Sequence, residues 1–248
     1  LVVKKSTWLV PKAQTSNQSA DPGNAYDFIP DIIFGKAGFG EIVPNQVTGN
    51  RVFLPAGITV DRGTSPNRIY VWDSGNSRIL GFTSLGTCES GANADRPCTN
   101  NLDCPSSVCQ INSTKNADLV FGQPDLFHAA CNGDSTIKAN PSAATLCSQR
   151  HPNQISLIEG PEPNNMAVDQ NHNLYVVDKW NNRALKYNDP FNPDKTEGKG
   201  DNIADLVWGQ PDFFSRSCNR NENDDCHIVA NPTSNSLCLD CHNLNVIN

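Results

Sequence analysis

The chain contains the stretch IYVWDSGNSRILGF at residues 69–82 and a near-copy of it, LYVVDKWNNRALKY, at residues 174–187. In both stretches, apolar and polar residues alternate on either side of an Asp-x-x-Asn sequence. Alternation with a period of two residues is typical of a β-strand with one buried face. Asp and Asn side-chain oxygens bind nearby backbone N–H groups in tight turns. Each stretch therefore predicts two short antiparallel strands joined by a tight turn.

The similarity between the copies extends outward from these stretches. PAGITVD at residues 55–61 precedes the first copy, and NNMAVD at residues 164–169 precedes the second. A further segment occurs three times, as DIIFGKAGF, DLVFGQPDL and DLVWGQPDF. Its aromatic residue is Phe34, Phe121 and Trp208 in turn, at a constant spacing of 87 residues. Each full copy therefore predicts a four-stranded antiparallel sheet, whose fourth strand comes from this segment.

An arginine begins the third predicted strand of each copy, at Arg78 and at Arg183. We expect each arginine to reach a carboxylate at the end of a neighbouring strand, Asp61 or Asp169, and so to tie strands together. A four-stranded sheet cannot bury both of its faces alone, so we also expect the copies to stack on one another.

The repeated segments resemble the NHL-repeat family of β-propellers over roughly residues 31–214. The residues that carry the resemblance are Gly57–Asp61, Ile69–Asp73, Asn76 and Arg78 in the first copy, and Met166–Asp169, Leu174–Asp178, Asn181 or Asn182 and Arg183 in the second. Asn165 stands where the family has a glycine. The resemblance implies an all-β fold of antiparallel four-stranded blades, with about six blades in a closed ring. This chain supplies two full copies and the start of a third, so we expect either part of a longer propeller or a ring closed by oligomerisation.

We therefore expect an extended N-terminal segment at residues 1–30 and NHL-type blades, incomplete as a ring, over residues 31–248. A blade needs only about 40 residues, so the repeat spacing leaves room for long insertions. These insertions cover about residues 87–116, 128–160 and 215–242. Leu1–Val10 alternates weakly and is interpreted either as a strand added to a neighbouring sheet or as a free tail.

The chain has 10 cysteines, most of them in predicted loops. This pattern indicates disulfides and hence an extracellular, periplasmic or cell-surface location. The first insertion holds four of them, for which sequence leaves all three pairings open: Cys88, Cys98, Cys104 and Cys109. Alignment of the second and third copies places Cys131 with Cys218 and Cys147 with Cys238. We therefore predict the disulfides Cys131–Cys147 and Cys218–Cys238.

Near the C-terminus, CLDCH matches the CxxCH motif of covalent c-type haem attachment. In this interpretation Cys238 and Cys241 bind the haem vinyl groups and His242 binds the iron. The candidates for the distal iron ligand are His227, which is nearest in sequence, and His128, His151 and Met166.

The repeat alignment favours a disulfide over haem at this motif. CSQRH in the second copy aligns with CLDCH in the third, so only Cys241 is new in the motif. Cys226 is also new in the third copy. Two new cysteines favour a fifth disulfide, Cys226–Cys241, whereas with haem bound Cys218 would pair with Cys226.

Composition argues against several other classes of site. The formal net charge is −7 and no basic run occurs, which disfavours nucleic acid as a partner. No apolar stretch is long enough to span a membrane. The Asn- and Asp-rich run at residues 219–225 lacks the glycine and the terminal glutamate of an EF-hand loop. It therefore predicts a solvated loop rather than a calcium site.

The resemblance also raises an enzymatic alternative, because some related propellers are metal-dependent lyases or lactonases. The five histidines lie mostly in predicted loops: His128, His151, His172, His227 and His242. No catalytic motif with recognised spacing occurs. We therefore predict a non-enzymatic scaffold, without catalytic or metal-binding residues, that binds a protein partner or self-assembles through its loops and N-terminal segment. The alternative function is electron transfer through a c-type haem.

Overall fold

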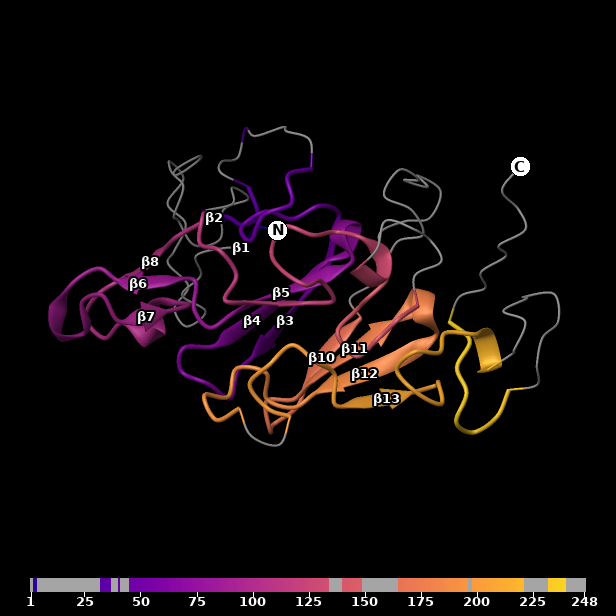
Figure 1. Cartoon of the computed structure of the whole chain (residues 1–248). Helices are drawn as coiled ribbons and strands as arrows, with labels where there is room; N and C mark the ends of the chain where they lie inside the picture. The colour runs from indigo at the N-terminus through magenta and orange to yellow at the C-terminus, as the bar shows by residue number, and fades with distance from the viewer. Residues whose placement is uncertain are drawn as a thin grey trace, which may run out of the picture.

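The computed structural model of the chain describes residues 2–3, 32–36, 40, 45–133, 140–148, 165–195, 198–220 and 232–239. Its strands form four antiparallel sheets, which confirms the predicted predominance of β-structure (Figure 1). The helical segments of the described residues are 3-10 turns: η1 (Ser74–Asn76), η2 (Gly91–Asn93), η3 (Asn101–Asp103), η4 (Cys131–Gly133), η5 (Lys179–Asn181) and η6 (Cys218–Arg220). Within this part of the chain, no helix has the length and apolar character needed to cross a membrane.

The two copies of the repeat form two sheets with the same topology. Sheet 1 consists of β3 (Pro55–Asp61), β4 (Arg68–Asp73), β5 (Arg78–Phe82) and β9 (Leu119–Phe121), in that spatial order. Sheet 2 consists of β10 (Met166–Val168), β11 (Leu174–Asp178), β12 (Arg183–Tyr187) and β13 (Leu206–Trp208). The prediction of four antiparallel strands, with the fourth from the FGQPD segment, is confirmed for both copies.

The main core lies between the two sheets. Sheet 1 contributes Tyr70, Trp72, Ile79 and Phe121, and sheet 2 contributes Met166, Leu174, Val176, Leu185 and Tyr187. Alternate residues of each strand point into this core, as the period of two residues requires. The ring of Phe121 meets the ring of Tyr187 edge-on, with their centroids 5.0 Å apart. Full burial of one such apolar side chain stabilises the fold by about 1.5–3 kcal/mol, so the shared core holds the sheets together.

The opposite face of sheet 1 is buried as well. Ile69, Val71, Leu80, Phe82 and Val120 pack there against Phe34, Val52, Leu85 and Ala117. The rings of Phe34 and Phe82 meet edge-on at 4.8 Å. Because both faces of sheet 1 are covered, β4 and β5 carry apolar side chains on both sides.

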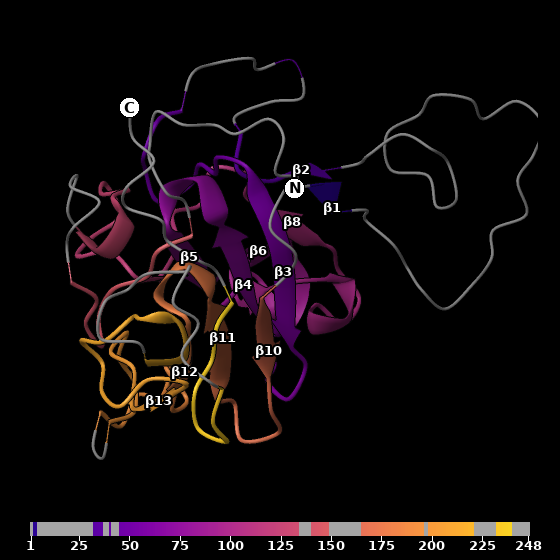
Figure 2. The ribbon, with the colours of Figure 1, turned by 90° about the vertical axis from the view of Figure 1, so that its right-hand side faces the viewer.

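Strands β3 and β10 lie side by side where the two sheets meet (Figure 2). The Thr59 hydroxyl in β3 donates a hydrogen bond of 3.1 Å to the Met166 carbonyl in β10. Asp61, at the end of β3, lies 2.8 Å from Nδ1 of His172 in the β10–β11 turn. These contacts fix corresponding strands of the two sheets next to each other.

The first insertion folds as a small sheet of its own, which we call the knuckle (residues 86–111). Its strands are β7 (Pro97–Cys98), β6 (Gly86–Cys88) and β8 (Cys109–Ile111), in that order. Its disulfides are Cys88–Cys104 and Cys98–Cys109. The knuckle projects from sheet 1 on the side away from sheet 2 (Figure 1). A stapled loop was expected here, and backbone pairing between the cysteine-bearing strands gives it regular structure.

At the N-terminus, β1 (Val2–Val3) pairs with β2 (Ile32–Ile33), with Val2 opposite Ile33. Ile33 corresponds to Val120 and Val207 by the 87-residue spacing, and these residues pair with the third strands of sheets 1 and 2. The β1–β2 pair therefore repeats the outer half of a sheet. The rest of the expected N-terminal segment lies outside the described residues.

Candidate functional site

The turn between the second and third strands carries a buried ionic cluster in each sheet. In sheet 2, Arg183 Nε lies 2.8 Å from Asp178 Oδ2, and both side chains are fully buried. The Asn181 amide donates to the same oxygen at 2.7 Å. Asp178 and Arg183 are directly opposite in the β11–β12 register. We call Asp178, Asn181 and Arg183 clamp 2.

Sheet 1 contains the same cluster, which we call clamp 1 (Asp73, Asn76 and Arg78). Arg78 Nε lies 2.7 Å from Asp73 Oδ2, and Asn76 donates to that oxygen at 2.8 Å. The expectation that the arginines reach Asp61 or Asp169 was wrong. The register places each arginine opposite the aspartate of its own turn, which is the nearer carboxylate.

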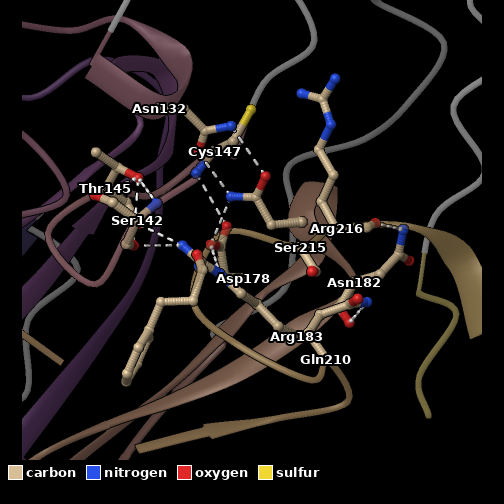
Figure 3. Close-up of polar contacts among 12 residues, drawn as sticks. Asn132, Ser142, Thr145, Cys147, Asp178, Asn182, Arg183, Gln210, Ser215 and Arg216 are labelled. Carbon is tan, nitrogen blue, oxygen red and sulfur yellow. Dashed lines mark hydrogen bonds and ion pairs between the residues drawn. The ribbon is translucent and has the colours of Figure 1, made fainter. Parts of the chain in front are cut away.

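Each clamp arginine also ties its sheet to two other parts of the chain. Arg183 Nη1 donates to the Phe213 carbonyl at 2.6 Å. Its Nη2 donates to the carbonyls of Ser142 and Thr145 at 3.1 and 2.8 Å (Figure 3). These bonds use the fixed fork geometry of the guanidinium group, which a lysine cannot reproduce.

Arg78 makes the corresponding set of bonds in clamp 1. Its Nη1 donates to the Leu126 carbonyl, and its Nη2 donates to the carbonyls of Thr48 and Arg51 at 2.8 and 3.0 Å. The segments that supply these paired carbonyls are here named capping segment 1 (residues 45–53) and capping segment 2 (residues 132–147). Both are bound in the same way.

The aspartate of each clamp accepts a backbone N–H group from a capping segment. Phe53 N donates to Asp73 Oδ1 at 2.6 Å, and Cys147 N donates to Asp178 Oδ1 at 3.0 Å. We expected these carboxylates to bind N–H groups inside their own turns, and this was wrong, because the turns close through their own backbone instead. Burial raises the pKa of Asp73, and the Arg78 guanidinium is the strongest influence that opposes the rise.

An asparagine pair completes each clamp, and sequence reasoning missed it. Asn132 and Asn181 exchange amide hydrogen bonds of 3.0 and 2.8 Å, and Asn45 donates to Asn76 at 2.7 Å. Asn45, Asn132 and Asn219 are spaced by 87 residues. This recurrence in the sequence was the signal by which the asparagines could have been found.

Two glutamines, also 87 residues apart, brace the clamps. The Gln123 amide donates to the carbonyls of Ser77 and Ala130, and the Gln210 amide donates to those of Asn182 and Ser217. The polar groups of the clamps are thus buried, and they join each sheet to the loops around it.

The second and third cysteine pairs form as the repeat alignment predicts. Cys131 is bonded to Cys147, and Cys218 is bonded to Cys238. A sulfur in a disulfide cannot also form a thioether, so the Cys218–Cys238 bond and haem attachment at Cys238 are mutually exclusive. The other residues of the haem interpretation that lie outside the described residues are Cys226, Cys241, His242, His227 and His151.

The two remaining distal-ligand candidates have other contacts. Met166 is buried in the core between the sheets. His128 lies 2.6 Å from Asp125 in its own loop. Haem attachment therefore stays a prediction that is tested by the chemical state of Cys238.

We expect the purified protein to have a featureless visible spectrum both before and after dithionite reduction. Its mass should fall below that of the reduced chain by two hydrogen atoms per disulfide, and a non-reducing digest should yield one peptide pair linked through Cys218 and Cys238. A sharp reduced α-band with a mass gain of one haem would contradict this expectation and would establish the CxxCH site.

Three sulfurs of the knuckle lie within 4.8 Å of one another, as the ligands of a metal ion would: those of Cys88, Cys98 and Cys104. All three are held in disulfides, so none is a thiolate. Thiolates are the form in which cysteine binds metals. The cysteines of the knuckle therefore hold its loop together as disulfides, and Leu102 is exposed on its surface.

Two loops present an exposed phenylalanine at equivalent positions of the repeat. Phe127 is 68% exposed and Phe214 is 66% exposed, and the two are 87 residues apart. Asp125 and Asp212 accept the backbone N–H groups of these phenylalanines at 2.8 Å. Hydrogen bonds lower the pKa of both carboxyl groups, from His128 to Asp125 and from the Ser215 hydroxyl to Asp212. Each phenylalanine therefore lies on a hydrogen-bonded turn whose aspartate is ionised at neutral pH.

The remaining residues that the sequence singled out lie partly within the described part of the chain. Of the Asn- and Asp-rich run, Asn219 belongs to the described residues, and there its side chain lies 3.4 Å from the Ser236 hydroxyl. Residues 221–225 lie outside that part of the chain. His172 contacts Asp61 and His128 contacts Asp125, so the two described histidines occupy separate loops.

No protein-family model, curated protein or solved structure matches this chain.

Proposed function

We propose that this protein is an exported, non-enzymatic β-propeller scaffold, built from NHL-type blades, that binds a protein partner through its loops. The observation that carries the proposal is the repeated display of an exposed phenylalanine, Phe127 and Phe214, on two hydrogen-bonded turns. Large aromatic side chains dominate the binding energy of protein interfaces when a partner buries them. A turn whose backbone is already ordered loses little conformational freedom on binding.

Further features support a scaffold role outside the cytosol. Four disulfides are characteristic of an oxidising compartment. The buried charges of the described residues serve to join sheets and loops, which supports a rigid framework rather than a catalytic centre. The bond between Cys218 and Cys238 supports the scaffold over the electron-transfer alternative, which needs Cys238 for haem.

Site-specific crosslinking tests the proposal. A photo-reactive phenylalanine analogue at position 127 or 214 is expected to capture one discrete partner protein from the extracellular or envelope fraction of the source organism. Replacing the other phenylalanine, by Phe214→Ser or Phe127→Ser, should lower the yield at least tenfold. Loss of an aromatic anchor costs about 2 kcal/mol or more, which is roughly a 30-fold loss of affinity.

The matched control places the same analogue at Leu102, which is also exposed but lies on the knuckle. Equal yields of the same adduct from all three positions would point to non-specific capture and overturn the proposal. A discrete adduct from position 102 alone would move the binding surface to the knuckle. Urea unfolding of each variant checks that the surface changes leave stability unaltered.

A further inference from the structure

The third copy of the repeat contains a capping segment of its own, described at residues 219–220 and 232–238, which we call capping segment 3. In these residues its hydrogen bonds repeat those of capping segment 2. Leu237 N donates to the Gly209 carbonyl at 3.3 Å, and Asn219 N donates to the Leu237 carbonyl at 2.9 Å. The equivalent bonds in capping segment 2 run from Leu146 N and Asn132 N, at 3.4 and 2.9 Å.

The agreement extends to the groups that bind a clamp. Thr233 N donates to Ser236 Oγ at 2.8 Å, as Ser142 N donates to Thr145 Oγ1 at 2.8 Å. The Cys218–Cys238 disulfide closes capping segment 3 where Cys131–Cys147 closes capping segment 2. Capping segment 2 binds Arg183 through the Ser142 and Thr145 carbonyls and binds Asp178 through the Cys147 N–H group. The equivalent groups of capping segment 3 are the Thr233 and Ser236 carbonyls and the Cys238 N–H group.

The described residues contain no third clamp for this segment. The sequence Asp-x-x-Asn-x-Arg occurs twice, at residues 73–78 and 178–183. Capping segment 1 binds the first of these clamps and capping segment 2 binds the second. A second copy of this chain, folded in the same way, would have both of its clamps occupied as well.

A sheet face next to capping segment 3 is exposed where its counterpart in sheet 1 is buried. Trp208 is 40% exposed, whereas its equivalent Phe121 is 0% exposed. Val177 is 36% exposed, whereas its equivalent Trp72 is 1% exposed. In sheet 1 these positions are covered by sheet 2. The outer face of sheet 2 is thus the position at which a further sheet would pack.

We infer that capping segment 3 and the outer face of sheet 2 form one interface for a four-stranded blade that carries its own Asp-x-x-Asn-x-Arg turn and that residues 1–248 do not contain. The arginine of that blade donates to the Thr233 and Ser236 carbonyls, and its aspartate accepts the Cys238 N–H group. Its apolar strand face covers Trp208 and Val177. The inference rests on the equivalence of the repeats and is independent of a partner-binding role for Phe127 and Phe214.

An extended protein supplies such a blade directly. Alignment of Cys238 with Cys147 places Asn248 opposite position 157, so a second copy of residues 158–214 is added immediately after Asn248. We expect backbone amide exchange in residues 232–239 to slow at least tenfold relative to the protein without the added copy. Hydrogen–deuterium exchange with mass spectrometry measures this directly.

Two changes in the added copy alone provide the matched comparison, because the original sheets keep every contact. Arg183→Ala in the added copy is expected to abolish the slowing, whereas Lys195→Ala, at an exposed position, is expected to preserve it. Exchange that is unchanged by the added blade, or slowed equally with Arg183→Ala, would overturn the inference. Light scattering of the protein of residues 1–248 is expected to give a monomer. A dimer with residues 232–239 protected would overturn it too, since a second copy would then be the occupant.

Discussion

Arg183→Ala is expected to lower the free energy of unfolding by about 3–5 kcal/mol, which is the usual cost of removing one partner from a buried ion pair. The change leaves the Asp178 carboxylate without its charged partner inside the protein. It also removes the donor from the Ser142 and Thr145 carbonyls, so capping segment 2 loses part of its attachment to sheet 2. Equilibrium urea unfolding, followed by far-ultraviolet circular dichroism, measures the effect.

Arg68→Ala is the matched control, because Arg68 also forms an ion pair between the two sheets. Its Nη1 lies 2.6 Å from Asp189, but both side chains are partly accessible to water. Such a pair contributes about 1 kcal/mol or less. If Arg183→Ala cost no more than Arg68→Ala, the clamp would not be the main polar link between sheet and capping segment. Arg183→Lys should lie between the two, since it keeps the charge and loses the forked donors.

Gly122→Ala is expected to have the second-largest effect, a loss of about 3 kcal/mol. Gly122 has φ +85°, and a Cβ atom there would lie 2.6 Å from Cβ of the buried Leu146. The left-handed backbone costs a non-glycine residue about 1–2 kcal/mol, and overpacking of a filled core costs about 1–3 kcal/mol more. Both costs apply here, because Gly122 has a left-handed backbone and also packs against Leu146 of capping segment 2. Thermal and urea unfolding measure the loss.

Gly91→Ala separates the two contributions. Gly91 has nearly the same backbone angle, φ +81°, but no atom lies within 4 Å of its added Cβ. This variant should show the backbone cost alone, about 1 kcal/mol. Equal losses at both positions would mean that the close approach of Gly122 to Leu146 does not constrain the fold.

The strands were predictable because their signal is local. Alternation in residues 69–82 and 174–187 reports which side chains share a face, and the 87-residue spacing reports which segment supplies the fourth strand. Alignment of the second and third copies predicted the disulfides Cys131–Cys147 and Cys218–Cys238. The 87-residue spacing also relates Asn45 to Asn132, but sequence reasoning missed their role, because it depends on the amide with which each one pairs.

The sequence by itself determined the repeat, the antiparallel strands and the cysteine pairs that the repeat aligns. Tertiary structure alone decided which carboxylate each arginine binds. Asp178 is the last residue of β11 and Asp169 directly follows β10, so the chain offers Arg183 two partners of the same chemistry. The register places Asp178 directly opposite Arg183, and the capping segment then closes over the pair. Burial makes that choice decisive, because a charge removed from water is tolerated only beside its partner.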